Sequence, residues 1–246
     1  MLTGKNKRTA LKDERIYRET PLPLSDDEFL DWRDVIHHTT EHPKPDKLLI
    51  LRWQSLAYLL DGTGSSISEL SDITRSMIKE AYEPLLSTDE EVNLKSIPVY
   101  NGKFKGQQRC VPISNGILQL VMSYINLLEK MWPEIDHDKL FINVNNGEPI
   151  KKSYLKNYTL NVIKNSKYAQ KLAHLNHHSF KLRFITLSVA KTLNSYNRDA
   201  VFTNILTVAM SAVRKLQLHA TNSTIEQYVH LALTYNKKFN LGTEKN

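Results

Sequence analysis

Cysteine is nearly absent from this chain, which has Cys110 alone among its 246 residues. A lone cysteine cannot close an internal disulfide or build a cysteine-based zinc site, which excludes disulfide-stapled secreted domains. No run of 18 apolar residues occurs, and residues 1–20 lack the apolar middle of a secretion signal. We therefore expect no membrane contact and a cytoplasmic protein, in the bacterial cytoplasm or nucleoid.

Acidic residues are missing from residues 149–198, a segment that holds ten lysines and arginines and is called the basic stretch below. Residues 21–91 show the opposite balance, with 15 acidic against 6 basic side chains. A concentrated positive surface favours a polyanion, because each neutralised phosphate releases condensed counterions. An ordinary basic protein with solvated lysines is the alternative. The expected DNA-contacting residues are Lys151, Lys152, Lys156, Lys164, Lys167 and Arg183.

Periodicity and capping signals predict an α+β fold that is mostly helical, with one small antiparallel sheet. Ser25 before three acidic residues opens a helix, a leucine-rich helix spans 48–60 and stops at glycines, and Ser65 or Ser66 caps a short helix to 73. Segments 92–100 and 107–113 are β-leaning and flank a lysine-bearing polar turn, which indicates a hairpin. Further helices are expected at 117–131, from 153 onward, and at 180–193, 201–218 and 223–235, with a short strand or turn at 140–142.

The same pattern predicts three segments. Residues 1–20 form a flexible basic arm, residues 21–235 one domain, and residues 236–246 a polar tail. With 41% hydrophobic residues, the middle segment is long enough to bury a large core.

Six motifs follow one another along this domain. They are Leu24-Ser25-Asp26-Asp27-Glu28, Thr63-Gly64-Ser65-Ser66-Ile67-Ser68-Glu69-Leu70, the segment from Lys103 to Pro112 ending in Arg-x-Val-Pro, Leu140-Phe141 with Gly147-Glu148-Pro149-Ile150, His178-Ser179-Phe180-Lys181 with Phe184, and His219 with Tyr228-Val229-His230. In this order they resemble the catalytic domain of tyrosine recombinases, the phage integrase family, over about residues 21–230.

The resemblance implies DNA cleavage and rejoining without a metal or cofactor. Tyr228 takes the position of the nucleophile that forms a 3′-phosphotyrosyl link, and His178, Lys181 and His219 take positions that contact the phosphate or move protons. Lys103 or Lys105 takes the position of the lysine that protonates the leaving oxygen; the register between the two stays open. The implied partner is double-stranded DNA, bound as a homo-oligomer or together with an active recombinase.

Both arginines of the family pattern are replaced, by Ser66 in the first signature and by Lys181 in the later box. The fork-shaped guanidinium of an arginine holds the transition-state phosphate by paired hydrogen bonds. Lysine cannot form such a pair of bonds, and serine carries no charge. Cleavage is therefore expected to be impaired, or rescued by a cation from Arg75, Arg183 or another subunit. The alternatives are a catalytically inactive DNA-binding or accessory module of a recombination system and, less favoured, a helical protein–protein adaptor.

Overall fold

The computed structural model describes residues 24–37, 46–86, 92–100 and 105–195, together with parts of two later helical turns. Those later residues are 207, 208, 210, 211, 213, 228, 229, 231 and 232. The expected N-terminal arm, the polar tail, Lys103 and His219 lie outside the described residues, as does most of the two C-terminal helices expected at 201–218 and 223–235.

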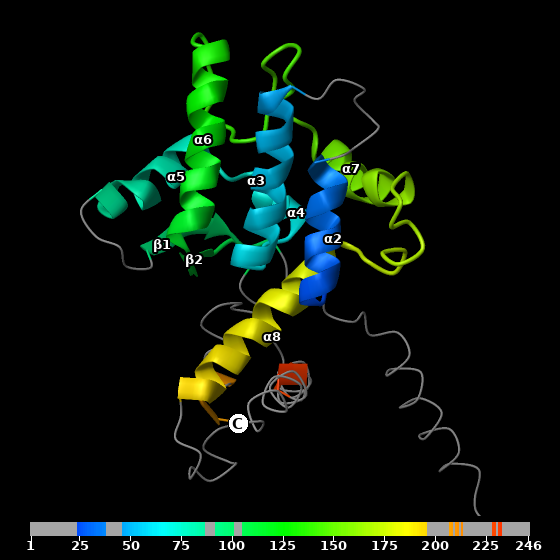
Figure 1. The fold of residues 1–246 in the computed structure, drawn as a ribbon. Helices are drawn as coiled ribbons and strands as arrows, with labels where there is room; N and C mark the ends of the chain where they lie inside the picture. The colour runs from blue at the N-terminus through cyan, green and yellow to red at the C-terminus, as the bar shows by residue number, and fades with distance from the viewer. Residues whose placement is uncertain are drawn as a thin grey trace, which may run out of the picture.

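Helix α3 (Lys47–Thr63) occupies the centre of the fold, and α2 (Asp26–His37) and α6 (Asn115–Met131) lie on its two sides (Figure 1). Trp53 and all leucines of α3 except Leu51 are almost wholly excluded from solvent. α6 can approach closely because Gly62 stands in the last turn of α3, where an added Cβ would come within 2.3 Å of the Ile117 side chain. Close packing of α3 on α6 thus depends on that glycine.

The helix boundaries follow the capping signals in the sequence. Ser25 Oγ accepts the Glu28 amide and Glu28 returns a carboxylate to the Ser25 amide, so α2 begins with a capping box. The Asp46 side chain accepts the Leu49 amide at the start of α3. At the other end, Gly64 adopts the left-handed conformation (φ 58°) that stops the helix. The glycine stop expected after residue 60 is confirmed, with α3 continuing three residues further.

Three short elements follow α3: α4 (Ile67–Leu70), α5 (Arg75–Tyr82) and the 3₁₀ turn η1 (Glu83–Leu86). Ser66 is the residue that caps α4, which settles the choice between the two serines. Helix α5 was not expected from the sequence. It begins because the Thr74 hydroxyl accepts the Met77 amide, and it buries Ile78 and Ala81 beside α6.

The expected hairpin is present, with β1 (Val92–Pro98) antiparallel to β2 (Gln108–Ile113). A bulge interrupts the pairing between Leu94 and Ile97, and Ser96 within it has a positive φ of 63°. The bulge lets both Leu94 and Ile97 face the core. On β2 every second residue is buried, and one of these inward residues is Arg109.

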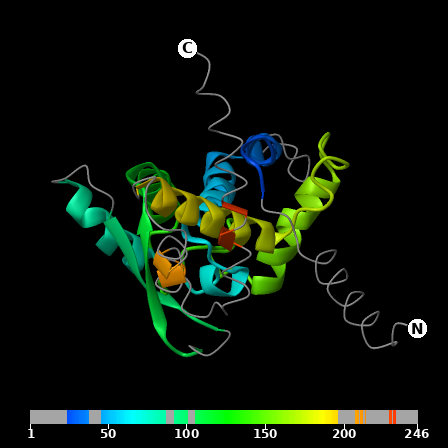
Figure 2. The same ribbon diagram turned by 90° about the horizontal axis from the view of Figure 1, so that it is seen from below.

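Helix α7 (Lys152–Lys164) and helix α8 (His177–Ser195) complete the described fold. Figure 2 shows α8 crossing the molecule, with α7 at one of its ends and the hairpin toward the other. Residues 140–142 form no regular strand; Ile142 makes one isolated bridge to Pro149. Among the described helices, none combines the length and apolarity needed to cross a bilayer. The fold class expected from the sequence, mostly helical with one small antiparallel sheet, is confirmed.

Candidate functional site

A buried arginine joins the hairpin to the turn between α3 and α4. Arg109 donates through Nη1 to the Thr63 carbonyl (3.0 Å) and through Nη2 to the Ser65 hydroxyl (2.6 Å). Nη2 also lies 3.4 Å from a carboxylate oxygen of Glu69, and both side chains of this Arg109–Glu69 pair are almost fully buried. The pair fixes the turn that carries Ser66 against the start of β2.

Two of the predicted site residues, His178 and Lys181, lie on the first turns of α8, and Lys181 lies near Glu69 and Arg109. Lys181 is partly buried. Burial lowers its pKa, while the nearby Glu69 raises it and the nearby Arg109 lowers it. The pKa of His178 is lowered by burial and by the charge of Lys181. Residues distant in sequence therefore meet here, although their catalytic roles stay predictions.

This grouping has more positive than negative charge. Two cations, Arg109 and Lys181, act on one carboxylate, that of Glu69. Lys181 is only partly buried, so an anionic group such as a phosphate can approach this positively charged grouping.

Tyr228 is described, and its side chain is buried, with 4% exposed. Burial raises the pKa of its hydroxyl to about 12, so the group is protonated at neutral pH. Lys105 is exposed in the turn that precedes β2. His219 and Lys103 lie outside the described residues.

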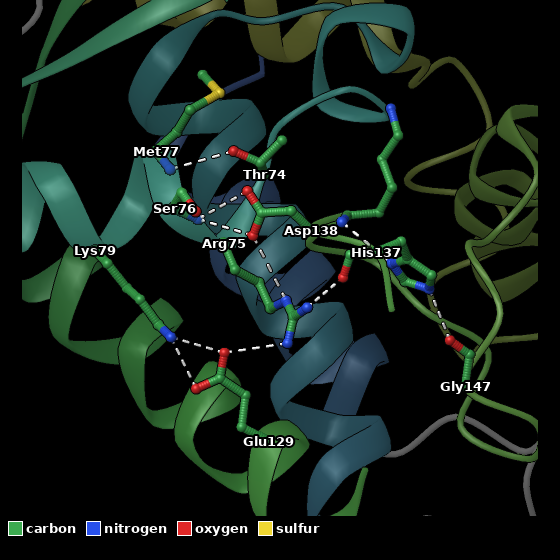
Figure 3. A network of polar contacts seen from close by, with 10 residues as sticks. Thr74, Arg75, Ser76, Met77, Lys79, Glu129, His137, Asp138 and Gly147 are labelled. Carbon is green, nitrogen blue, oxygen red and sulfur yellow. Dashed lines mark hydrogen bonds and ion pairs between the residues drawn. The ribbon is translucent and has the colours of Figure 1, made fainter. Parts of the chain in front are cut away.

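Arg75, expected as one replacement cation, is held elsewhere. Figure 3 shows its guanidinium between Glu129 and the loop that carries His137 and Asp138. Nη1 lies 3.1 Å from Glu129, Nη2 donates to the His137 carbonyl, and Nε is 3.9 Å from Asp138. Lys79 joins the same Glu129 carboxylate at 2.8 Å. Arg75, one of the possible sources of a replacement cation, is therefore engaged in a network that clamps α5 to α6.

Arg183 is likewise engaged inside the fold. Its Nε donates to Asp61 at 2.8 Å, and its Nη1 lies 2.6 Å from Asp26. The side chain is 90% buried between these acids. The expected DNA contact through Arg183 does not fit this placement, because two carboxylates already neutralise it and solvent hardly reaches it.

Acidic residues of α2 neutralise part of the basic stretch. Lys167 lies 2.8 Å from Asp34, and Lys171 pairs with Asp31. By contrast, four expected DNA-contacting lysines are exposed on or next to α7 and form no ion pair within the described ranges: Lys151, Lys152, Lys156 and Lys164. They are called the α7 lysines below.

The α7 lysines adjoin the grouping around Lys181. Lys156 lies close enough to His177 to contribute to the lowering of its pKa to about 4, after the larger effect of burial. Lys152 lies near Asp72, which follows α4. A basic surface thus continues from α7 to the start of α8.

Arg109 and Glu69 are the residues whose roles the sequence did not reveal. Both stand inside quoted motifs, yet nothing marked them as a buried ion pair. The alternation on 108–113 could have found Arg109, because it shares the inward register of Val111 and Ile113. Within the described ranges, no three His, Cys, Asp or Glu side chains gather as a metal ion would require.

No protein-family model matches the chain, and no curated protein matches it significantly in sequence. Solved structures do resemble it. The crystal structure of XerA recombinase superposes with a TM-score of 0.60 at 17% identity, covering 93% of this chain and 67% of XerA. The Tn1549 transposon integrase, solved as a fragment in complex with transposon right-end DNA, gives a TM-score of 0.50 at 17% identity, covering 86% of this chain and 66% of that fragment. The chain thus has a tyrosine-recombinase-like fold and spans about two thirds of each neighbour.

Proposed function

We propose that this protein binds double-stranded DNA with the surface formed by the α7 lysines and the start of α8. The observation that carries the proposal is the set of α7 lysines, which are exposed and form no ion pair within the described ranges, on a recombinase-like fold. The DNA-bound state of the Tn1549 integrase supports the same kind of partner. Phosphates on this surface would neutralise these lysines and release condensed counterions.

On this surface we propose an impaired strand-cleavage site. The Tyr228 oxygen would attack a DNA phosphorus, its proton would pass to a neighbouring base such as neutral His178, and the 5′-oxygen would leave with a proton from a hairpin lysine. A 5′-hydroxyl reverses the reaction by attacking the 3′-phosphotyrosyl link. Lys181 offers one charged contact to the transition state, and Ser66 offers none. Since removal of one donor costs roughly 10²–10³ in rate, cleavage is expected to be slow.

Burial of Tyr228 adds a second barrier. A hydroxyl with 4% exposure and a pKa of about 12 cannot meet a phosphodiester without movement of the segment that carries it. DNA binding, alone or with a second copy or an active recombinase, would have to expose it. This observation also favours the second candidate function, a catalytically inactive DNA-binding module.

A suicide substrate distinguishes the two candidates. A nick placed next to the cleavage position lets the 5′-hydroxyl fragment diffuse away, so that any cleavage traps a covalent protein–DNA adduct. We expect a slowly accumulating adduct that is absent in Tyr228→Phe, with DNA affinity unchanged in the variant. Salt-sensitive DNA binding without any adduct would establish the inactive module, and absence of DNA binding at low salt would overturn both.

A further inference from the structure

A second polar concavity lies between the N-terminal ends of α3 and α7 and the loop that joins residues 143 to 151. Its volume is about 940 Å³, within the range of small-ligand sites. None of Ser66, His178 and Lys181 lines it, so it is distinct from the grouping described above. The lining is rich in amides and includes one exposed aromatic ring: Asn143, Asn145, Asn146, Asn157, Asn161 and Tyr154.

A buried arginine forms part of this lining. Arg52 is 3% exposed, its Nη1 donates to the Ile142 carbonyl at 2.7 Å, and its guanidinium lies over the Trp53 ring at 4.3 Å. Its Nε has no hydrogen-bond partner, and within the described residues it forms no ion pair. Burial lowers its pKa, and Asp46 is the weakest of the influences that raise it. A buried guanidinium without a bound carboxylate is costly, so this one favours an anion from outside the chain.

The start of α7 supplies a second attraction for an anion at the same place. Lys151 is its N-cap residue and makes no side-chain cap, and both Lys151 and Ser153 line the concavity. The amides of Tyr154 and Leu155 donate to the Lys151 carbonyl. The amides of Lys152 and Ser153 therefore have no intrahelical acceptor. Uncapped N-terminal amides and the positive end of the helix are a general anion-binding arrangement.

Two carboxylates also face the concavity and limit what can bind there. The Asp46 carboxylate accepts the Leu49 amide, and Glu148 is an exposed residue of the lining. They disfavour a highly charged anion and suit a ligand that carries hydroxyl or amino donors beside a single anionic group. The amides and the Tyr154 ring, which is 45% exposed, suit a sugar and a base.

We propose that this concavity binds a nucleotide phosphate, with Arg52 and the free amides of α7 holding the phosphate and the amide-rich wall contacting the attached sugar and base. The phosphate belongs to a free mononucleotide or to a nucleotide within a DNA strand. The inference stands independently of strand cleavage, because neither Tyr228 nor Lys181 takes part.

Titration of the full chain with deoxyadenosine monophosphate at constant ionic strength tests the proposal. The readout is the amide NMR signals of Lys152 and Ser153. We expect saturable shifts with a half-point at or below about 1 mM, the weak end of specific binding. Absence of saturable shifts at these two amides would overturn the proposal.

Two variants decide whether the shifts arise at this site. Arg52→Met keeps the alkyl stem and removes the fork, and Ser153→Asp places a carboxylate at the start of α7. Each should weaken the nucleotide at least about tenfold, because charge-assisted contacts are lost or replaced by repulsion. Ser153→Asp is at an exposed helix start where an acidic residue stabilises, so it keeps the test valid if Arg52→Met fails to fold. Gln119→Glu, an exposed site on α6, is the charge-matched control that should bind normally. Unchanged affinity in Ser153→Asp would refute the assignment.

A second arm identifies the source of the phosphate. A short duplex is added to the nucleotide-loaded protein. Displacement of the nucleotide from the Lys152 and Ser153 signals assigns the site to a DNA strand, whereas persistence of these signals with DNA bound elsewhere assigns it to a free nucleotide. Both outcomes require the saturable shifts of the first experiment, and neither depends on an adduct with Tyr228.

Discussion

At the scale of single residues, Ser66 is a helix cap at the position where the resemblance to tyrosine recombinases leads us to expect an arginine. The Ser66 hydroxyl accepts the Glu69 amide, and the Glu69 carboxylate accepts the Ser66 amide at 2.6 Å. The same carboxylate binds Arg109. Serine is therefore well suited to this turn as a cap, whereas an arginine side chain cannot accept the Glu69 amide. A serine at position 66 stabilises the turn, whereas an arginine there would add positive charge to the candidate site but lose the cap.

Restoring both arginines should separate these demands. We expect Ser66→Arg to lower the free energy of unfolding by about 1 kcal/mol through loss of the cap, measurable by urea denaturation. Combined with Lys181→Arg, it should raise the rate of adduct formation on the nicked substrate by roughly 10²–10³ for each donor gained. If the double variant folds, binds DNA and still forms no adduct, impaired cleavage is the wrong explanation and the inactive module is correct.

His177 makes stability depend on pH. Burial, followed by the nearby Lys156, lowers its folded pKa to about 4, and its Nε2 is buried without a partner. The His177 side chain is protonated below about pH 6.5 in the unfolded chain and below about pH 4 in the folded chain. Unfolding between these pH values therefore takes up a proton. Stability should therefore fall by about 1–3 kcal/mol as pH drops from 6.5 to 4. His177→Phe should flatten this dependence in thermal unfolding; an unchanged pH profile would contradict the assignment.

At the scale of elements, one buried ion pair attaches the hairpin to the turn before α4. Arg109 from β2 contacts the Thr63 carbonyl, the Ser65 hydroxyl and the Glu69 carboxylate at once. Of these three groups, only the Glu69 carboxylate is charged. Breaking such a pair leaves a charge buried alone, whereas removing both charges avoids that cost. The position of the hairpin over the site thus depends on an interaction between two motifs that are 40 residues apart.

One single variant and one double variant measure this attachment. Arg109→Met should destabilise the protein by about 3–5 kcal/mol, because Glu69 is left buried without its partner. Glu69→Gln added to Arg109→Met should recover part of this loss, since glutamine can keep the capping box of α4 without the charge. Urea denaturation of the two variants gives both values. A double variant as unstable as, or less stable than, Arg109→Met would show that packing and not charge explains the cost.

Elements with strong local signals could be predicted from the sequence, and those stabilised by distant contacts could not. The starts of α2 and α4 and the end of α3 depend on Ser25, Ser66 and Gly64, all visible as capping residues. Helix α5 has only eight residues, and its arginine is fixed by Glu129, 54 positions away. The ion pairs of Arg75 and Arg183 could not be predicted for the same reason, because their carboxylate partners are remote in sequence.

At the scale of the whole molecule, the basic stretch is not one uniform surface. Acidic residues of α2 pair with basic residues in the segment 167–183, so Lys167 and Lys171 stabilise the contact between α2 and this segment. The α7 lysines have no such partners in the described ranges. Net charge along the sequence could predict a polyanion partner, but only the fold separates lysines that pair within the protein from lysines that remain for DNA.

This division predicts which lysines control the salt dependence of DNA binding. Each phosphate contact contributes about 0.9 to the slope of log affinity against log salt. We expect Lys152→Ala and Lys156→Ala each to reduce the slope by nearly that amount, as measured by fluorescence anisotropy over a series of salt concentrations. Lys167→Ala and Lys171→Ala are controls of equal charge change, and their slopes should stay near that of the unaltered protein because Asp34 and Asp31 already neutralise those lysines. Equal reductions of the slope in all four variants would place DNA on the side of α2 and would contradict the proposed surface.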